Sequence, residues 1–401
     1  MKKFEKYAAN ENNPNWDKII SRQSPLYNRN NFMRSEFERD YTRIIHSTAY
    51  RRLKHKTQVF FSPENDHICT RIEHVTHVES ISYTIAKNLG LNTELTKAIA
   101  VAHDVGHSPF GHEGEKILSE ISNKDLGISF WHEKNGLELV DNIELLEDTE
   151  RFKQNLDLTY AVRDGIISHC GEIDENSLKP RSQAIDLKDY TKPNEYSPYT
   201  WEACVVKISD KISYIGRDIE DAFHLNLLNN EKSEDLKNIL GIQNEEALNN
   251  PNIINELIID ICNNSTIEKG ICFSTEKLNL INKIKEFNYN NIYSHPRLDA
   301  SNEYFKIIIN RIYNILKNAY DKENTLSNLK ELKKFYPQTI IRFKDWLHKY
   351  WNLTDRTNTN LKNKIIYDYT NPQDYYKAII DFIAGMTDNY AIDMYNEIVS
   401  F

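Results

Sequence analysis

The feature that most restricts the fold of this chain is the helical spacing of its apolar residues. In residues 202–223, EACVVKISDKISYIGRDIEDAF, apolar side chains recur at steps of three and four. Such spacing is typical of an amphipathic helix with one face in a core. Residues 74–90 and 373–399 repeat the pattern. Because the 401 residues include only 12 Gly and 11 Pro, and no alternating series is long enough for a sheet, the sequence predicts an all-α fold.

Changes in composition divide the chain into four predicted parts. Residues 170–200 are polar and punctuated by prolines, which indicates a long surface excursion, and residues 225–300 are rich in Asn and charge. Gly90 is expected to end one helix, and Thr93, with Thr96 as the alternative, is expected to cap the next. The predicted parts are an N-terminal arm (1–32), a helical core (33–224), a peripheral helical region (225–364) and a C-terminal helical segment that packs on the core (365–401).

Composition argues against several classes of protein. No run of eighteen apolar residues is present, and the N-terminus lacks the apolar stretch of a signal peptide, so neither a membrane span nor a membrane partner is expected. Five scattered cysteines without CxxC spacing fit reduced thiols and a cytoplasmic location. The net charge of −9 disfavours a nucleic-acid-coating protein. Single-stranded nucleic acid stays open as a partner, although no motif indicates it.

Residues 98–115, AIAVAHDVGHSPFGHEGE, place three imidazoles and several carboxylates directly after an apolar helical run. His103 and Asp104 are adjacent, and adjacent side chains on a helix diverge by about 100°. Both can therefore reach one point only at a helix end, which Gly106 and Pro109 supply. Imidazole and carboxylate ligands together suit a divalent cation of the Mn, Fe, Ni, Zn or Mg type.

Two further ligands are expected from neighbouring helices. His74 lies on the preceding helix, and Asp210 interrupts the apolar spacing of residues 202–223. Taken singly, such a histidine is more often a core or surface residue, and such a carboxylate is usually a solvated helix charge. The order His, His-Asp, Asp across three helices makes a metal site the better interpretation. His77, three residues after His74, is the competing first ligand.

Five segments of the chain form a recognisable set of motifs. They are RRLKHKTQVF (51–60), TRIEHV (70–75), AHDVGHSPFGHEGE (102–115), DLTYAVRDGI (157–166) and MTDNYA (386–391). Together they resemble the bacterial deoxyguanosine triphosphate triphosphohydrolases, the branch of the HD superfamily that hydrolyses deoxynucleoside triphosphates (dNTPs). The resemblance implies an HD-domain phosphohydrolase core. It also implies hydrolysis of dGTP, or of other dNTPs, to the deoxynucleoside and inorganic tripolyphosphate.

The resemblance also implies which residues hold the metal, namely His74, His103, Asp104 and Asp210. In the family motif R-x-x-H the ligand follows the arginine by three residues, which matches Arg71 to His74 and not to His77. The expected cofactor is Mg²⁺ or Mn²⁺, with Fe, Ni and Zn as alternatives.

A bound triphosphate brings about four negative charges, so cationic groups are needed around it. Arg71, one turn from His74, is expected to fork onto the α-phosphate. Lys211, next to Asp210, is expected to meet the tripolyphosphate end.

Proton transfer is expected from the histidines that follow the His-Asp pair. His107 or His112 can move a proton because imidazole titrates near neutral pH. By resemblance His112 and Glu115 form a catalytic pair, in which Glu115 orients His112. His132 corresponds to a further family histidine near the phosphates. The alternative for His107 and His112 is a loop histidine bonded to backbone.

The nucleoside end is assigned by resemblance. Tyr214 is expected to stack under the sugar, and Asp218 to accept a hydrogen bond from the 3′-hydroxyl. Gln58 and Val59 match the pair that closes over C2′ and leaves no room for a ribose hydroxyl. For Tyr214 the alternative is a partly buried aromatic at a helix seam.

Members of this branch are commonly oligomeric and bind nucleotides between subunits as activators. A homo-oligomer is therefore expected, and the basic run 51–56, with Arg52, is a candidate for nucleotide contacts; a solvated helix face is the alternative. Two rival functions stay open. One is an HD phosphodiesterase or nucleotidase acting on other phosphate esters, and the other is a catalytically idle dNTP sensor.

Overall fold

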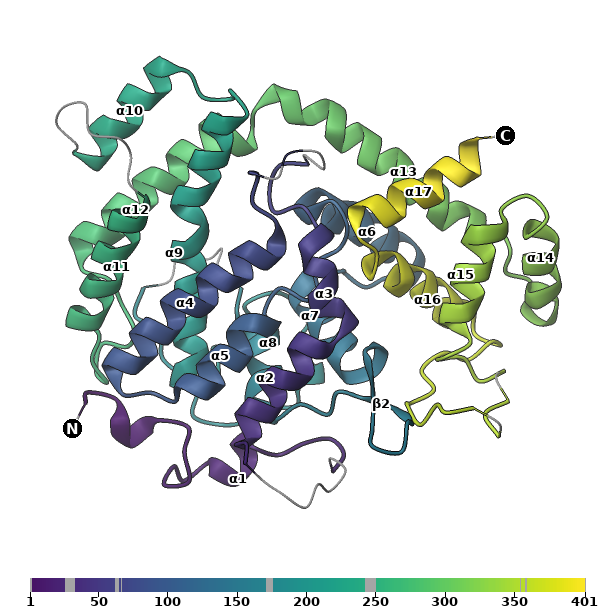
Figure 1. Ribbon diagram of the computed structural model, residues 1–401, viewed down its shortest axis with the longest axis horizontal. Coiled ribbons are helices and arrows are strands. Elements are labelled where there is room, and N and C mark those ends of the chain that lie inside the picture. Colours follow the sequence, from purple (N-terminus) through teal and green to yellow (C-terminus); the bar gives the residue numbers. More distant parts are fainter. Residues whose placement is uncertain are drawn as a thin grey trace.

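The computed structural model of the protein describes residues 2–25, 33–61, 65, 67–170, 176–241, 250–353, 355–357 and 359–400. These residues form a helical assembly, and the predicted all-α class is confirmed (Figure 1). The α-helices are α1 (Trp16–Ile19), α2 (Glu36–His46), α3 (Thr48–Arg52), α4 (Arg71–Leu89), α5 (Thr93–Ala102), α6 (Gly111–Leu126), α7 (His132–Glu138), α8 (Tyr160–Ser168), α9 (Trp201–His224), α10 (Asn230–Leu240), α11 (Asn250–Asn264), α12 (Thr275–Asn288), α13 (Asp299–Lys317), α14 (Thr325–Leu332), α15 (Pro337–Leu347), α16 (Pro372–Ala384) and α17 (Asp388–Val399).

Short 3₁₀ and π turns connect several of these helices. They are η1 (Glu5–Tyr7), η2 (Leu53–His55), η3 (Leu139–Ile143), η4 (Leu187–Asp189), η5 (Tyr289–Tyr293), η6 (Pro296–Leu298) and η7 (Lys322–Asn324). In the described part of the chain, the strands are β1 (Leu145–Glu147) and β2 (Lys153–Asn155), which pair as one antiparallel hairpin.

Helix α5 lies at the centre of a helical bundle, in contact with α2, α4, α8 and α9. Its last five residues, 98–102, are all buried, because other helices surround it and leave it no solvent face. This explains why the segment before the His-Asp pair is apolar without alternation. Among the described helices, none is long and apolar enough to cross a membrane.

The turn between α4 and α5 follows the sequence prediction at one end only. Gly90 ends α4 with a left-handed φ of 89°, as predicted. The predicted cap of α5 is wrong. Asn92, and not Thr93 or Thr96, caps this helix, because its side-chain oxygen accepts hydrogen bonds from the backbone N–H groups of Glu94 and the residue after it.

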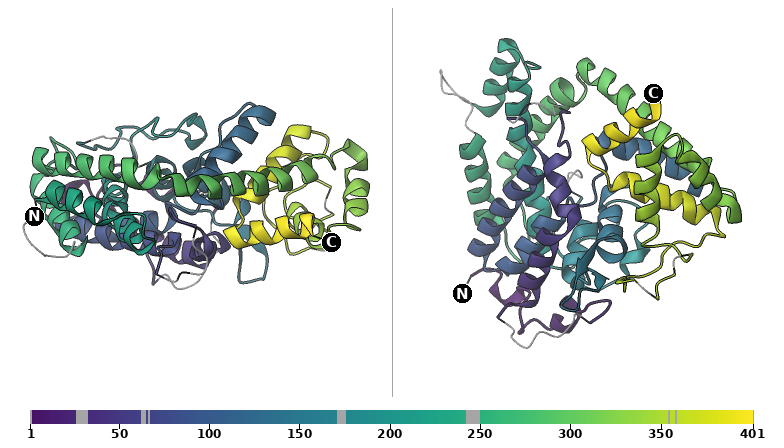
Figure 2. Two further views of the ribbon diagram at one scale, coloured as in Figure 1. Left: turned by 90° about the horizontal axis from the view of Figure 1, so that it is seen from above. Right: turned by 45° about the vertical axis from the view of Figure 1, so that its right-hand side comes forward.

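Two further groups of helices flank the central bundle (Figure 1). Helices α11 and α12 pack on α9, with α10 on α12, and helices α14 to α17 lie at the opposite end of the molecule. Helix α13, 19 residues long, links the two groups and packs on α6, α16 and α17 (Figure 2).

Hydrophobic clusters cross the predicted boundaries between the parts. One cluster joins Phe110, from the predicted core, to Ile309 of α13 and Ile379 of α16. Another joins Ile208 of α9 to Ile284 of α12. The four-part division stays a prediction, but its parts share cores.

The predicted surface excursion over 170–200 is irregular and largely exposed or partly exposed, but it is attached to the core at several residues. Leu187 and Tyr190 are buried in the cluster that also holds α5. Arg181 forms an ion pair, with a nitrogen–oxygen distance of 2.5 Å, with the fully buried Asp164 of α8. The segment is held against the core because a buried carboxylate needs a cationic partner. Residues 171–175 lie outside the described residues.

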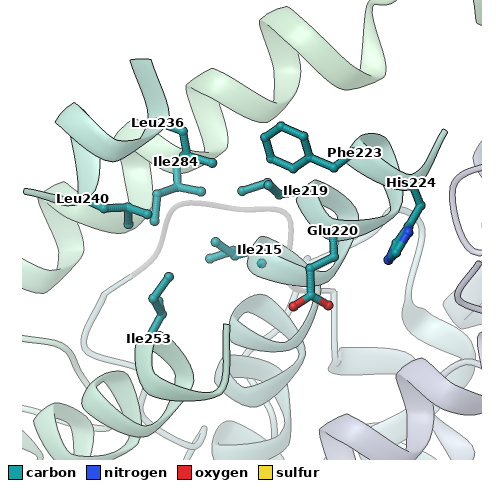
Figure 3. A pocket seen from close by; sticks show the side chains of 10 residues that line it. Ile215, Ile219, Glu220, Phe223, His224, Leu236, Leu240, Ile253 and Ile284 are labelled. Atoms are coloured by element: carbon teal, nitrogen blue, oxygen red, sulfur yellow. The ribbon is translucent and has the colours of Figure 1, made fainter. Parts of the chain in front are cut away.

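A small apolar cavity of about 180 Å³ lies where α9 meets α10, α11 and α12 (Figure 3). Aliphatic and aromatic side chains form most of its wall, and Glu220 and His224 lie at its edge. Its lining residues are Ile215, Gly216, Ile219, Glu220, Phe223, His224, Leu236, Leu240, Ile253 and Ile284.

Candidate active site

A cavity of about 750 Å³ collects most of the predicted site residues. The predicted residues in its lining are Gln58, Val59, Arg71, His74, Asp104, His107, His112, His132, Asp210, Tyr214 and Asp218. The lining also contains residues that the sequence did not indicate, including Glu133, His169, Cys170, Tyr289 and Tyr293. Segments separated by more than two hundred residues therefore meet at one site.

His103 has the local structure of a metal ligand. It follows the last residue of α5 and is fully buried. Its Nδ1 lies 2.7 Å from the carbonyl oxygen of Ala100, so Nδ1 carries the proton and Nε2 carries the lone pair. Nε2 is buried and has no hydrogen-bond partner among the described residues. An imidazole lone pair in this state needs a cation or a donor.

His74 is held in the same tautomer by Ser213. The Ser213 hydroxyl donates to the carbonyl oxygen of Asp210 at 2.8 Å, so it accepts from Nδ1–H of His74 at 3.2 Å. Nε2 of His74 then faces the Asp210 carboxylate at 3.0 Å. His77 is absent from the histidine and carboxylate groups that converge here, which agrees with the choice of His74.

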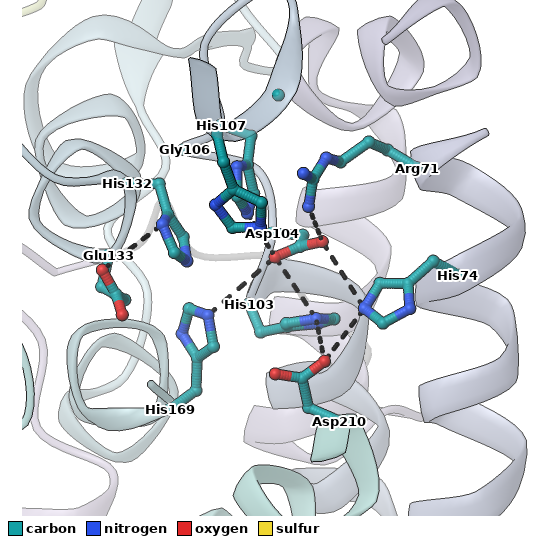
Figure 4. Close-up of polar contacts among 12 residues, drawn as sticks. Arg71, His74, His103, Asp104, Gly106, His107, His132, Glu133, His169 and Asp210 are labelled. Carbon is teal, nitrogen blue, oxygen red and sulfur yellow. Dashed lines mark hydrogen bonds and ion pairs between the residues drawn. The ribbon is translucent and has the colours of Figure 1, made fainter. Parts of the chain in front are cut away.

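The four predicted ligands belong to two overlapping groups that could hold a metal ion (Figure 4). One group is His74, His103 and Asp210, and the other is His103, Asp104 and His169. Nε2 of His103 lies 3.4 Å from Asp104 and 3.8 Å from Asp210, and Nε2 of His74 lies 3.7 Å from Asp104. Ligand atoms about 2.1 Å from a common octahedral ion lie about 3.0 Å apart at adjacent positions and about 4.2 Å apart at opposite positions, so these distances lie within that range. The donor set of two imidazoles and two carboxylates therefore fits a divalent cation of the predicted type.

The charges around this cluster favour a cation. Burial opposes protonation of His74, yet Asp210 and Asp104 raise its pKa. Burial also acts against ionisation of Asp104, but the nearby imidazoles and Arg71 hold the pKa of Asp104 well below its usual range. Arg71 donates from Nη1 to Asp104 at 2.9 Å and is almost fully buried. The guanidinium predicted to meet a phosphate thus lies beside the predicted ligand Asp104.

The predicted pairing of Glu115 with His112 differs from the structure. Oε2 of Glu115 lies 3.9 Å from Nδ1 of His112, whose side chain is 57% exposed, but 2.9 Å from Nδ1 of His132. The other oxygen of Glu115 accepts the backbone N–H of His132 at 3.1 Å. Because α7 begins at His132 and abuts α6, a histidine 17 residues away lies closer than the one on the same helix.

Two carboxylates keep a positive charge on His132. Although burial disfavours that charge, Glu133 and Glu115 raise the pKa of His132 to about 10. Burial alone would raise the pKa of Glu115, but the charge of His132 and its hydrogen bond lower it to about 2. At neutral pH His132 is therefore an imidazolium, and its Nδ1–H donates a hydrogen bond to Glu115.

His107 and His169 complete the ring of imidazoles around Asp104 (Figure 4). His107 lies 3.0 Å from Asp104 and stacks on His132 with ring centroids 3.8 Å apart. Burial, Arg71 and His132 lower the pKa of His107 well below its usual range, so it is neutral. His169 binds the carbonyl oxygen of Ile166 through Nδ1, and its Nε2 faces Asp104 at 3.9 Å.

The end of the cavity predicted to hold the nucleoside contains a buried carboxylate with an unexpected partner. The hydroxyl of Tyr293 donates to Asp218, and burial raises the pKa of Asp218 to about 7. Tyr214 lies one turn before Asp218 on α9 and also lines the cavity. Gln58 is buried, and its side-chain oxygen has no hydrogen-bond partner in the described part of the chain. Val59 is partly buried beside it.

Two predicted substrate contacts lie away from this cavity. Lys211 is buried on α9 and is not among the residues that line the cavity, because it diverges by about 100° from its neighbour Asp210. Arg52 forms an ion pair with Glu144 at 2.7 Å and lines a separate hollow of about 450 Å³. The structure thus brings neither side chain to the predicted phosphate site.

The residues that sequence reasoning missed come from two kinds of place. His169 directly follows α8, and Glu133 is the second residue of α7. For both, a polar residue next to apolar neighbours was the available signal. Tyr289 and Tyr293 come from a turn after α12, within the region predicted to be peripheral, where the sequence offered no signal.

Comparison with known proteins agrees with this geometry. Residues 71–215 match the HD domain, and residues 347–397 match the phosphohydrolase-associated domain. A deoxyguanosinetriphosphate triphosphohydrolase-like protein of Caldanaerobacter subterraneus subsp. tengcongensis is 33% identical over 367 residues, which span 91% of this chain and 85% of the relative. The chain belongs to this triphosphohydrolase-like family of HD-domain phosphohydrolases.

Other relatives in the same family are similar along most of their length. A protein of the same description from Pelagibacter ubique is 31% identical over 369 residues, 91% of this chain and 94% of the relative. One from Clostridium tetani is 30% identical over 370 residues, 91% and 86%. The HD-domain match begins at Arg71 and includes the whole four-residue cluster. The second match includes α16 and most of α17.

Proposed function

We propose that this phosphohydrolase cleaves deoxynucleoside triphosphates, dGTP among them, to the deoxynucleoside and inorganic tripolyphosphate. The observation that carries the proposal is that one cavity holds both a cluster suited to a divalent cation and the Asp218–Tyr293 contact suited to a sugar hydroxyl. Its volume of about 750 Å³ is within the range of sites for ligands of nucleotide size. The names of the relatives support the same substrate class.

At the phosphate end, a divalent metal bound by His74, His103, Asp104 and Asp210 would polarise the α-phosphate as a Lewis acid and orient a water molecule. Mg²⁺ or Mn²⁺ is the proposed ion, with Fe, Ni and Zn as alternatives. The buried guanidinium of Arg71 adds a fixed positive charge beside Asp104, where a phosphate oxygen would approach.

His132 is the proposed proton donor. Hydrolysis at the α-phosphorus adds the water oxygen to the tripolyphosphate and leaves the 5′-oxygen of the nucleoside in need of a proton. His132 is charged at neutral pH, and Glu115 binds its Nδ1–H, so Nε2–H is the proton available for transfer. Glu115 fixes the orientation of the ring, as a carboxylate does for a catalytic imidazole.

At the nucleoside end, the Asp218 carboxylate is proposed to accept the 3′-hydroxyl and Tyr214 to lie under the sugar. The free oxygen of Gln58 and the apolar side chain of Val59 would close over C2′. Val59 offers no partner to a 2′-hydroxyl, so a ribonucleotide would bury that group unpaired.

Product identification tests the proposal directly. Purified protein would be incubated with each dNTP, and with GTP, in Mg²⁺, in Mn²⁺ and in EDTA, and the products separated by ion-exchange chromatography. Release of tripolyphosphate and deoxynucleoside in metal, with none in EDTA, is the expected result. Stepwise release of orthophosphate would favour the nucleotidase alternative, and binding without turnover would favour the dNTP sensor. A homo-oligomer, an activating nucleotide and a cytoplasmic location stay predictions.

A further inference from the structure

The motif MTDNYA (386–391) has no role in the function proposed above, yet the structure gives its aspartate an unusual position. Asp388 is the first residue of α17, and its carboxylate is buried. One oxygen accepts the backbone N–H of Thr57 at 2.8 Å and the Thr57 hydroxyl at 2.5 Å. The other accepts the backbone N–H of Phe110 at 2.8 Å. A single side chain from the C-terminal segment therefore joins two distant loops.

Both of these loops form walls of the candidate active site. Thr57 directly precedes Gln58 and Val59, which line the nucleoside end of the cavity. Phe110 lines the cavity itself and precedes Gly111 and His112, which also line it. Asp388 itself does not line the cavity, so it contacts these loops on the side that faces away from the cavity.

The second loop needs outside support to keep its shape. Phe110 has a φ of 65°, in the left-handed region that side chains other than glycine rarely adopt. A residue held there keeps its conformation only when the surrounding structure fixes it. The hydrogen bond from Phe110 to Asp388 is such a restraint. Gly111 follows with a φ of 60°, and a Cβ on it would lie 3.2 Å from the carbonyl oxygen of Gln58, so the two loops touch.

The first loop is held from the opposite side by a residue of the metal cluster. Arg71 donates to the carbonyl oxygens of Thr57 at 3.2 Å and Gln58 at 3.3 Å, and the same guanidinium binds Asp104. Residues 57–58 thus lie between Arg71 and Asp388. A shift of this loop would change both the sugar pocket and the guanidinium next to the metal cluster.

From this geometry we propose that Asp388 is a positioning residue for the reaction, through which α17 sets the closure of Gln58 and Val59 over the nucleoside sugar. The inference rests on the proposed function. It assigns to the phosphohydrolase-associated segment a direct part in choosing the substrate sugar.

The alternative is that Asp388 only stabilises the fold, and the same helix offers a matched control. Glu397, near the end of α17, accepts the backbone N–H groups of Gln338 at 2.8 Å and Thr339 at 2.7 Å, and the Thr339 hydroxyl at 2.6 Å. Glu397 thus accepts the same kinds of hydrogen bond as Asp388, but it joins α17 to the start of α15. Glu397, Gln338 and Thr339 do not line the cavity.

The test compares Asp388→Asn with Glu397→Gln in the full chain. Each change replaces one acceptor oxygen with an amide NH₂, which cannot accept from a backbone N–H. Amide hydrogen exchange in the absence of nucleotide should become roughly tenfold faster at Thr57 or Phe110 in Asp388→Asn, and at Gln338 or Thr339 in Glu397→Gln. With dGTP and GTP, Asp388→Asn should lower kcat/KM for dGTP by about 10- to 100-fold and narrow the dGTP/GTP ratio. Glu397→Gln should leave that ratio unchanged.

A second variant guards against loss of folding. Thr57→Val replaces the hydroxyl that donates to Asp388 with a methyl group and should narrow the dGTP/GTP ratio of kcat/KM by a smaller factor than Asp388→Asn does. Thr57→Ser keeps the hydroxyl and should therefore keep the wild-type ratio. Equal effects of Asp388→Asn and Glu397→Gln on the ratio would overturn the proposal, as would unchanged exchange at both Thr57 and Phe110. If the wild-type chain hydrolyses no dNTP, the proposed function fails instead, while the exchange data still report on the two loops.

Discussion

Glu115 holds His132, and not its helix neighbour His112, by a hydrogen bond of 2.9 Å to Nδ1. The same carboxylate also caps the first residue of α7 by accepting the His132 backbone N–H. Backbone and ring are thus fixed by one side chain, which leaves only Nε2 of His132 to act on a substrate.

Removal of the Glu115 charge should therefore act through His132. In Glu115→Gln the loss of one carboxylate should lower the pKa of His132 from about 10, because Glu115, with Glu133 and Asp104, is one of the charges that raise it. The alkaline limb of the kcat profile should move to lower pH, and kcat at neutral pH should fall by about 10²- to 10⁴-fold, as for loss of a general acid. A kcat profile across pH 6–10 for both proteins, roughly the range in which such a histidine titrates, measures the shift.

His112→Ala is the matched comparison for that experiment. Because His112 lies 3.9 Å from Glu115 and is largely exposed, its removal should lower kcat much less than His132→Ala. The reverse order of effects would return the proton-transfer role to His112, as the sequence predicted.

Asp210→Ala should abolish metal binding. Asp210 faces Nε2 of both His74 and His103, and without it one metal ligand and the charge that favours a cation are lost. Elemental analysis after gel filtration should find about one divalent ion per wild-type chain and none in the variant. Circular dichroism should show unchanged helix content, and retention of the ion by the variant would contradict the ligand assignment.

Rejection of ribonucleotides should depend on Val59. A merely apolar pocket rejects an added hydroxyl only about 10²-fold, so greater selectivity requires a close wall against C2′. Val59→Ala removes that wall and should narrow the dGTP/GTP ratio of kcat/KM. Tyr293→Phe deletes the donor to Asp218 and should weaken both substrates alike, because the 3′-hydroxyl is common to them. Equal turnover of GTP and dGTP by the wild-type chain would contradict the sugar assignment.

The sequence predicted those parts of the site that local spacing determines. Helical periodicity located α4 and α9, and His103 and Asp104 are close in the chain, so their meeting required only a helix end. The pairing of Glu115 with His132 could not be predicted, since it depends on how α6 meets α7. The approach of Tyr293 to Asp218, 75 residues earlier, likewise depends on tertiary packing.

The same dependence on packing explains why position 106 has no room for a side chain. A Cβ at this position would lie 2.0 Å from the carbonyl oxygen of His132 and 2.2 Å from the backbone nitrogen of Gly136. Gly106→Ala should therefore displace α7, lower the free energy of unfolding by about 1–3 kcal/mol and reduce kcat. Gly385→Ala, whose Cβ would meet its nearest atom at 3.4 Å, is the control and should change neither quantity appreciably. Urea unfolding and a dGTP assay on both variants would measure this.

Lys56 should make stability depend on pH in a direction unusual for a lysine. Its ammonium is almost fully buried between the carbonyl oxygens of His107 and Ala384, and burial, followed by repulsion from Arg52, lowers its pKa from 10.5 to about 7. Between these two values the unfolded chain binds a proton that the folded chain does not, so the free energy of unfolding rises with pH. The slope due to Lys56 is at most about 1.4 kcal/mol per pH unit.

Lys56→Met removes this contribution, while all other groups titrate in both proteins. Urea unfolding at several pH values should show wild type gaining stability relative to the variant as pH rises above about 7. A difference that stays constant over this range would mean that Lys56 keeps its proton in the folded state.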